Sequence, residues 1–290
     1  MEKTFLSIVT ISYNQAKYLK KAIESVIDNR ADDIEYIVVD AGSTDGSREI
    51  ISEYANDIDH IIFETDQGPS DGLNKGFAKA RGTIGFFLNS DDYFLPGAIE
   101  KLRNAWSTNM DKDFMLCRAW MVNGSGEPLR ELIPTPITIS HLRLGAATIV
   151  QQGFSFKMDV FRLIGGFNLE NRSCWDYELL CELAGREATF GVSNERIAAF
   201  RVYDESITGG GAGEKHEKLA DKDFVRIHRS CLSDDRSFDR MKMLKVGRWY
   251  KMLFNPSHAL HRVREHLFPT SILTRWEKDT DFLANHSDVK

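Results

Sequence analysis

Residues 84–92 read Ile-Gly-Phe-Phe-Leu-Asn-Ser-Asp-Asp, an apolar run that ends in two adjacent carboxylates. A short continuous apolar run predicts a strand that is buried on both faces of a sheet. Because an unpaired charge is costly in an apolar core, Asp91 and Asp92 are expected at the edge of that sheet, where they could hold a cation. Divalent ions such as Mg²⁺ and Mn²⁺ take carboxylate oxygens together with phosphate oxygens. The competing interpretation is a solvated turn before Pro96.

The sequence before this run alternates between strand-like and helix-like segments. Strands are expected over residues 5–11, 35–39 and 58–64, and helices over residues 16–28, 47–54 and 70–81. Such alternation predicts an α/β fold in which helices cover a parallel sheet.

A polar loop follows each of the four predicted strands. The loops comprise residues 12–15, 40–46, 66–71 and 89–92. Since ligands of such sheets bind beyond the carboxyl ends of the strands, the four loops are expected to converge on one crevice. The sequence therefore predicts a single binding site built from four separate parts of the chain.

The second half of the sequence is less regular. Helices are expected over residues 97–107, 157–163 and 175–185, strands over 114–122, 151–156 and 197–202, and a turn at 165–167. Residues 206–213 contain four glycines and few apolar side chains, a composition that predicts a mobile loop. From residue 215 onward the pattern is typical of amphipathic helices.

The composition is typical of a soluble globular protein with one large domain, or with one domain and an appended subdomain. Of the 290 residues, 42% are hydrophobic and 28% are charged, and the net charge of −6 gives no electrostatic case for binding nucleic acid. The four cysteines lack metal-site spacing, and the sequence shows neither a signal peptide nor an apolar stretch long enough to span a bilayer. We therefore expect a cytoplasmic protein with free thiols.

Basic residues are concentrated toward the C-terminus. Residues 226–275 contain 11 Lys and Arg against four Asp and Glu. Within residues 240–268, aromatic and apolar side chains are mixed with basic ones, as in a helix that lies on an anionic membrane surface. Such a helix is equally suited to packing on the rest of the protein or on a second copy of it. Peripheral membrane contact and a homo-oligomer are therefore both left open.

Several loop residues carry groups that suit a nucleotide. Asp40, at a predicted strand tip, can accept hydrogen bonds from a base imide or a ribose hydroxyl, or it can cap a turn. Thr10, Ser12 and Asn14 offer hydroxyl and amide groups beside it. Lys75 is a candidate to meet a phosphate, although a lysine there is also typical of a solvated helix.

Together, four strings in this part of the sequence resemble the family 2 glycosyltransferases, nucleotide-sugar enzymes of the GT-A fold. They are Val9–Gln15, Val38–Ser47, Asp66–Gly76 and Leu88–Asp92, in the family's order and at its usual spacing. The similarity covers about residues 1–205. It implies a mostly parallel sheet flanked by helices, with a C-terminal helical extension.

The resemblance also implies a domain organisation and an activity. Residues 1–213 would form the catalytic domain, with a nucleotide-sugar-binding half (1–100) and an acceptor-binding half (101–213), and residues 214–290 a basic helical extension. The activity would be inverting, metal-dependent transfer of a sugar from a nucleoside diphosphate sugar to an acceptor hydroxyl, with Mn²⁺ or Mg²⁺. A UDP-sugar is the commonest donor for such enzymes. The acceptor would be a carbohydrate or a lipid-linked molecule in bacterial surface polysaccharide or glycoconjugate synthesis.

The same resemblance assigns roles to individual residues. Donor-binding residues would be Thr10, Ser12, Tyr13, Asn14, Asp40, Gly42, Ser43, Asp66, Gln67, Asp71, Asn74, Lys75, Ser90 and Asp91. Asp92 would ligate the metal directly, and Asp91 would contact the metal or the ribose. Because Ser90 takes the first position of the family's D-x-D-type element, the number of protein ligands is left open.

Asp176 is the residue that the resemblance places in the position of the catalytic base. It lies in the string Trp175-Asp-Tyr-Glu-Leu179, which is similar to the start of the family's acceptor-side helix. Glu178 would support it or bind the acceptor, and Trp175 would form a platform for a sugar ring. A purely structural interpretation also exists, because acidic residues in a first helical turn are favoured by the helix dipole.

The sequence departs from the family pattern near its C-terminal side. Tyr203 stands where a histidine is frequent, which leaves a metal or phosphate role there in doubt. His216 could reach the diphosphate or be a surface residue. A sugar-nucleotide nucleotidyltransferase is disfavoured because residues 12–16 lack its Gly-rich, basic loop. A nucleotide-sugar-binding or scaffold protein that has lost catalysis is the remaining alternative.

Overall fold

The computed structural model describes residues 4–206, 213–234, 240–254, 260, 267 and 270–280. Its first half alternates strands and helices: β1 (Leu6–Ser12), α1 (Ala16–Ile27), β2 (Ile34–Asp40), α2 (Ser47–Glu53), β3 (His60–Phe63), α3 (Pro69–Phe77) and β4 (Ile84–Asn89). The second half contains β5 (Tyr93–Phe94), α4 (Ala98–Ser107), β6 (Phe114–Val122), β7 (Pro128–Leu132), α5 (Ile139–Arg143), β8 (Phe154–Lys157), α6 (Met158–Ile164), α7 (Trp175–Gly185) and β9 (Phe190–Arg201). The C-terminal part contains α8 (Gly213–Leu232), α9 (Arg240–Phe254) and α11 (Thr270–Thr280).

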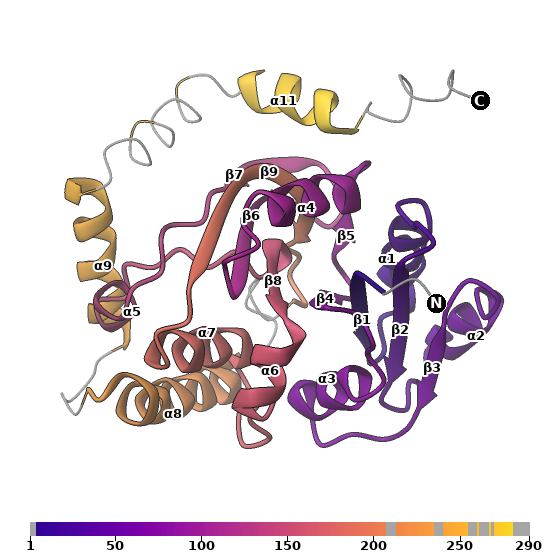
Figure 1. Ribbon diagram of the computed structural model, residues 1–290, viewed down its shortest axis with the longest axis horizontal. Coiled ribbons are helices and arrows are strands. Elements are labelled where there is room, and N and C mark those ends of the chain that lie inside the picture. The colour runs from indigo at the N-terminus through magenta and orange to yellow at the C-terminus, as the bar shows by residue number, and fades with distance from the viewer. Residues whose placement is uncertain are drawn as a thin grey trace.

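The strands form one sheet, and helices cover both of its faces (Figure 1). The strand order is β3-β2-β1-β4-β8-β6-β9-β5, with β7 paired to β6. Strands β3, β2, β1 and β4 are parallel, whereas β8 runs antiparallel to both of its neighbours, β4 and β6. The predicted α/β fold is therefore confirmed, although the sheet is more mixed than a mostly parallel one.

Most predicted elements of the second half are present, with three differences. Strands β5 and β7 and helix α5 were not predicted, because segments of two to five residues carry too little periodicity to be recognised. Strand β8 begins at Phe154, since residues 151–153 form a 3₁₀ turn. Strand β9 begins at Phe190, well before the predicted start at Ile197. Its polar first half is held in the sheet by parallel pairing with β6.

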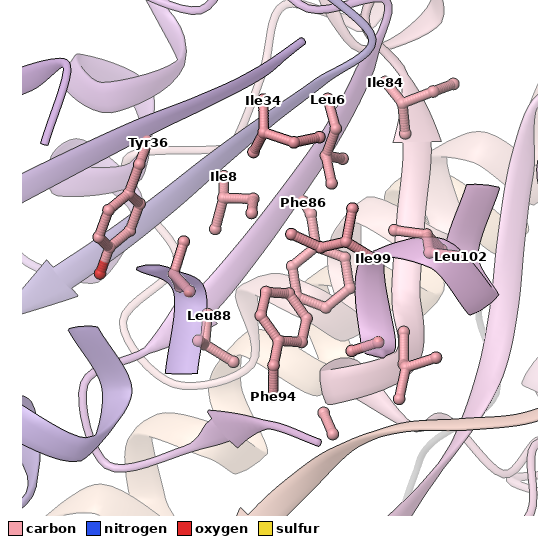
Figure 2. Packing of buried hydrophobic residues seen from close by; sticks show 14 of the residues in the cluster. Leu6, Ile8, Ile34, Tyr36, Ile84, Phe86, Leu88, Phe94, Ile99 and Leu102 are labelled. Atoms are coloured by element: carbon pink, nitrogen blue, oxygen red, sulfur yellow. The ribbon is translucent and has the colours of Figure 1, made fainter. Parts of the chain in front are cut away.

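The apolar strands are buried on both faces because successive side chains point to opposite sides of the sheet. Ile8 and Phe86 belong to a cluster between the sheet and helices α1 and α4, which Figure 2 shows from close by. Val9 and Phe87, one position along each strand, belong to a second cluster with residues of α3, α6 and α7. Burial on both faces explains why these strands read as continuous apolar runs.

The register of the parallel strands brings the polar loops together. Ser12 at the end of β1 pairs with Asp40 at the end of β2, and Ile11 pairs with Asn89 at the end of β4. The three strands therefore end at the same edge of the sheet. The predicted convergence of their loops is a direct result of this alignment.

Helix α11 is joined to the sheet by buried polar contacts. The indole Nε1 of Trp120 on β6 donates a hydrogen bond to Asp279 (2.8 Å). Glu131 on β7 is only 4% exposed and accepts hydrogen bonds from Arg118, Arg196 and Arg275, the last of these on α11. Helix α11 is thus packed onto the same sheet as the rest of the protein.

Replacing Glu131 with glutamine tests this network. The change leaves three guanidinium groups without their buried carboxylate and is expected to lower the free energy of unfolding by about 2 kcal/mol. The arginines are each about a quarter exposed, so the loss of free energy of unfolding is smaller than for a fully buried ion pair. Urea unfolding measures the effect. The control Glu127→Gln, at an exposed turn, should change stability by less than about 0.5 kcal/mol, and equal losses in both variants would contradict the account.

Candidate active site

A cavity of about 1460 Å³ opens at the edge where β1 and β4 end. Residues from many separate parts of the chain, from Ile11 to Leu244, line it. Among the predicted site residues, the cavity brings together Ser12, Tyr13, Asp66, Ser90, Asp91, Trp175 and Asp176. Asp91 and the predicted base Asp176 therefore face the same space, whereas Asp92, the predicted direct metal ligand, does not line it.

The other predicted site residues lie around the cavity without lining it. They are Thr10, Asn14, Asp40, Gly42, Ser43, Gln67, Asp71, Asn74, Lys75, Asp92 and Glu178. Most of those with polar side chains use their polar atoms in hydrogen bonds within the protein. Their placement shows how the loops of the site are held.

Asp40 organises the loop that follows β2. Its Oδ1 accepts hydrogen bonds from the backbone N–H groups of Gly42 (3.0 Å) and Ser43 (2.9 Å) and from Nε of Arg48 (2.7 Å). Burial alone would raise the pKa of Asp40, but the hydrogen bonds from Arg48 and Ser43 hold it below its usual value. Gly42 has a φ of +109°, which a side chain would strain. The ionised carboxylate of Asp40 thus holds the loop in place.

Asn14 connects the loop after β1 to the loop after β2. Its backbone N–H donates to Ser43 Oγ (2.8 Å), and its side-chain oxygen accepts from the N–H of Thr44 (2.9 Å). Asn14 has a φ of +53°, a conformation that asparagine tolerates better than most residues. Thr10 lies deeper, where its hydroxyl accepts a hydrogen bond from Tyr36 (3.2 Å). Both residues shape the wall that Ser12 and Tyr13 present to the cavity.

The loop after β3 contributes one carboxylate to the cavity. Asp66 accepts a hydrogen bond from the N–H of Gly68 (2.8 Å), and its partial burial raises its pKa. Asp71 instead accepts from the N–H of Gln67 (2.9 Å) and forms an ion pair with Lys75 (3.3 Å). The ammonium of Lys75 also donates to the carbonyl of Thr65 (2.6 Å), so this lysine fastens the loop to α3.

Asn74 joins two parts of the fold that are far apart in sequence. Its side chain donates to the carbonyl of Phe167 (2.8 Å) and accepts from the N–H of the same residue (2.9 Å). The turn at Gly166 passes so close that a Cβ there would lie 2.7 Å from Asn74 Oδ1. This pair of hydrogen bonds holds the predicted turn at residues 165–167 against α3.

The carboxylates of Asp91 and Asp92 have different surroundings. Asp92 is 1% exposed and accepts hydrogen bonds from the N–H of Arg201 (3.0 Å) and the amide of Gln152 (2.9 Å). Burial, followed by the charge of Asp91, raises the pKa of Asp92 well above its usual value. Asp91 lines the cavity and accepts a hydrogen bond from the hydroxyl of Tyr203 (3.1 Å). Burial also raises the pKa of Asp91.

Arg201 and Tyr203 complete this part of the site. Arg201 donates from Nε to the carbonyl of Asp91 and from a terminal nitrogen to the carbonyl of Gly124, each at 3.0 Å. The sequence drew attention to Tyr203 but assigned neither residue to the site. Gln152, which holds Asp92, was missed altogether, because one amide in an irregular segment gives no periodic or motif signal.

Asp176 lies in the first turn of α7 and faces the cavity. Its Oδ1 accepts a hydrogen bond from the N–H of Tyr177 (2.8 Å), and burial raises its pKa. Glu178 is buried away from the cavity, where it pairs with Arg226 on α8 and accepts from Asn168 (2.9 Å). Burial alone would raise the pKa of Glu178, but its hydrogen bonds, above all that from Arg226, lower it. Glu178 therefore joins α7 to α8.

The cavity has an excess of negative charge. Its described lining includes five carboxylates, those of Asp66, Asp91, Glu131, Asp176 and Glu205, against the guanidinium groups of Arg130 and Arg201. Within the described part of the chain, no cluster of three or more His, Cys, Asp or Glu side chains could hold a metal ion without help. One cavity-facing carboxylate does fit Mg²⁺ or Mn²⁺ when ligand phosphates supply further oxygens.

Two further sequence predictions concern the predicted mobile loop at residues 206–213 and His216, which follows it. Most of the predicted loop, residues 207–212, lies outside the described residues. His216 is in the first turns of α8, is partly exposed and is not among the lining residues. In the described residues, none of the helices combines the length and the apolar character required to cross a membrane.

The fold is α/β, and its cavity gathers carboxylates from both halves of the chain. The model of the family described as "Glycosyl transferase family 2" matches residues 7–163, which is more than half of the chain. The protein therefore belongs to glycosyltransferase family 2, as the sequence resemblance implied.

Curated relatives support this assignment. The putative teichuronic acid biosynthesis glycosyltransferase TuaG of Bacillus subtilis is 28% identical over 211 residues, which cover 71% of this chain and 82% of TuaG. Other relatives are more similar over shorter regions. An uncharacterized glycosyltransferase of Nostoc sp. is 38% identical over 107 residues, and the match spans 33% of its length. The chain thus spans only part of some of its curated relatives.

Solved structures share the fold at low sequence identity. TarS 1–349 of S. aureus, in complex with UDP-GlcNAc, is similar with a TM-score of 0.60 and 16% identity over 90% of this chain and 74% of that one. The mannosyltransferase PcManGT of Pyrobaculum calidifontis, in complex with GDP-Man and Mn²⁺, gives a TM-score of 0.59 and 15% identity over 96% and 84%. These similarities establish the GT-A fold predicted from the sequence.

The raised pKa of Asp176 predicts a stability effect. A group whose pKa is higher in the folded state favours folding when protonated, and this contribution is lost as the pH rises through the folded-state pKa. At pH 7 the buried charge therefore costs stability. Asp176→Asn keeps the acceptor for the Tyr177 N–H and should melt at a higher temperature than the wild type at pH 7. The difference should shrink as the pH falls toward 4. A variant that is less stable at pH 7 would contradict this.

Proposed function

We propose that the protein is an inverting, metal-dependent glycosyltransferase whose donor is a nucleoside diphosphate sugar, with a UDP-sugar as the first candidate. The observation that carries the proposal is the presence of Asp91 and Asp176 in one cavity at the ends of the parallel strands. The complexes of similar folds with UDP-GlcNAc and with GDP-Man and Mn²⁺ support a nucleotide-sugar donor. Synthesis of a bacterial surface polysaccharide or glycoconjugate is the proposed setting, by analogy with the name of TuaG.

The nucleoside is proposed to bind at the ends of β1 and β2. Tyr13 is 62% exposed at the cavity wall, so its ring is free to stack on a base. Ser12 Oγ is buried and makes no hydrogen bond within the described residues, which suits a hydroxyl awaiting a ligand. In this proposal Asp40, Gly42, Ser43 and Asn14 act by holding the loops, and residues 1–100 form the donor half of the domain.

Asp91 is the proposed metal contact. The sequence favoured Asp92, but both oxygens of Asp92 accept N–H donors at 1% exposure, whereas Asp91 faces the cavity. When bound, Mn²⁺ or Mg²⁺ would neutralise charge on the departing diphosphate. Such neutralisation is favourable because Asp66, Asp91 and Asp176 at the cavity wall would otherwise repel a diphosphate. Tyr203 orients Asp91 through its hydroxyl.

Asp176 is the proposed catalytic base. The acceptor hydroxyl attacks the anomeric carbon, its proton passes to Asp176, and the bond from the anomeric carbon to the diphosphate oxygen breaks. A single displacement of this kind inverts the configuration at that carbon. Burial raises the pKa of Asp176, which brings the carboxylate closer to the pH at which a base works best. Trp175, at the cavity wall beside it, would contact the acceptor, with the remaining acceptor contacts coming from residues 101–213.

Donor hydrolysis and sugar transfer with Mn²⁺ present test these assignments. Asp91→Asn and Asp176→Asn should each lower the rate by at least about 100-fold. The matched control Asp57→Asn alters an exposed carboxylate that does not line the cavity and should stay within about threefold of the wild type. Nucleotide binding is followed separately by the rise in melting temperature with UDP and Mn²⁺. Binding without any turnover would indicate a catalytically silent protein, and unchanged rates in both variants would refute the mechanism.

We also propose that α9 contacts an anionic membrane surface from the cytoplasmic side. Val246 is 54% exposed and Trp249 is 67% exposed, and Lys245 is exposed near them. Most of residues 255–268, the rest of the predicted amphipathic segment, lie outside the described residues.

Vesicle co-sedimentation tests the membrane contact. Trp249→Ser should reduce binding to vesicles that contain anionic lipid by several-fold, because an aromatic anchor at the interface is lost. Neutral vesicles are the control and should bind weakly with either protein. Equal binding of wild type and variant to anionic vesicles would exclude this helix as the contact.

A further inference from the structure

Six apolar side chains line the cavity, and we call them the apolar arm: Met121, Leu132, Ile133, Ile149, Phe200 and Leu244. Arg130, Glu131 and Thr148, their neighbours in sequence, also line the cavity. Each of the six apolar side chains is partly exposed, although their strand neighbours Val122 and Ala199 are buried. Apolar surface left accessible in a concave site is unfavourable in water and is typical of a place that an apolar ligand covers.

Sheet pairing and hydrogen bonds connect the segments that carry the apolar arm. Met121 on β6 pairs with Phe200 on β9 in the sheet, and β7 lies on the other side of β6. Hydrogen bonds between Thr135 and Thr148 join the segment after β7 to the segment that carries Ile149.

Helix α9 closes the apolar arm. Its backbone at Gly247 approaches Gly145 so closely that a Cβ at Gly247 would lie 2.2 Å from the carbonyl oxygen of Gly145. Leu244 lies one turn earlier, near the same glycine, and lines the cavity. The opposite face of the helix exposes Val246 and Trp249. One helix thus lines the cavity and presents the proposed membrane contact.

The apolar arm adjoins the reaction centre. Helix α5, which leads into Gly145, packs on α7, and the hydroxyl of Tyr177 donates to the carbonyl of Leu142 (3.3 Å). Asp176 precedes Tyr177 and faces the cavity. A molecule in the apolar arm would therefore extend away from the hydroxyl that Asp176 deprotonates.

We propose that the acceptor is a glycolipid, in which the sugar with the reacting hydroxyl carries a hydrocarbon chain that lies in the apolar arm. This inference rests on the proposed function, because it assigns the part of the site that the polar donor leaves uncovered. A nucleoside diphosphate sugar has no hydrocarbon to place there, whereas a chain drawn from a membrane would reach the arm beside α9.

Calorimetric titration with octyl β-glucoside and methyl β-glucoside, both below the micelle concentration of the octyl compound, tests the inference. The octyl compound should bind at least about tenfold more tightly, because several methylene groups leave water. Leu244→Asn and Ile149→Asn should each remove this preference. Val246→Asn, two residues along the same helix on its exposed face, should retain it.

Titration with UDP and Mn²⁺ on the same proteins provides the folding control and separates the two proposals. Unchanged UDP binding by Leu244→Asn and Ile149→Asn shows that the variants are folded. If the wild type binds UDP normally but binds octyl β-glucoside no more tightly than methyl β-glucoside, the glycolipid inference is overturned and the proposed function is left intact. An octyl preference that all variants share would also overturn it, since the chain would then bind elsewhere. Absence of UDP binding would instead refute the proposed function, and the acceptor role with it.

Discussion

The carboxylate of Asp92 is buried at the end of β4, and three parts of the chain donate hydrogen bonds to it. The N–H of Arg201 comes from β9, and the amides of Gln152 and Asn89 come from the turn before β8 and from β4 itself. An ionisable group at 1% exposure is tolerated only when its lone pairs are satisfied in this way. Because β4, β8 and β9 come together at this point, Asp92 fixes where the next residue, Asp91, enters the cavity.

The proposed donor and acceptor halves of the site are built by different means. The donor side is held by short loops whose carboxylates and amides bond to the backbone, as Asp40 does at Gly42 and Ser43. Loops held by such hydrogen bonds are already ordered before a ligand binds. Binding is favoured because little conformational entropy is then lost. The acceptor side depends on packing between distant elements, with α9 against Gly145 and α11 joined to β7 through Glu131. Helix α9 therefore lines the site, and α11 supports the strand β7 beside it.

The sequence predicts the first half of the fold well because its signals are local. Runs such as Ile84–Leu88 and the helical spacing after Gln15 are visible within a dozen residues. The ends of the strands, and therefore the position of the site, follow from them. The roles of single residues were harder to predict, since they depend on partners far along the chain. Asn74 bonds to Phe167, 93 residues away, and Asp92 bonds to Arg201, 109 residues away. No local pattern reveals such partners, so the sequence could not separate Asp91, which faces the cavity, from Asp92, which does not.

The central claim is that Asp176 promotes a single displacement at the anomeric carbon of a donor whose diphosphate lies at Asp91. Proton NMR of the sugar released in the first minutes of donor hydrolysis tests this directly, because it reports the configuration before the free sugar equilibrates. With a UDP-α-sugar and Mn²⁺, the account predicts that the β-anomer appears first. Initial release of the α-anomer would contradict it, since retention requires a different arrangement of groups from the one that Asp91 and Asp176 provide.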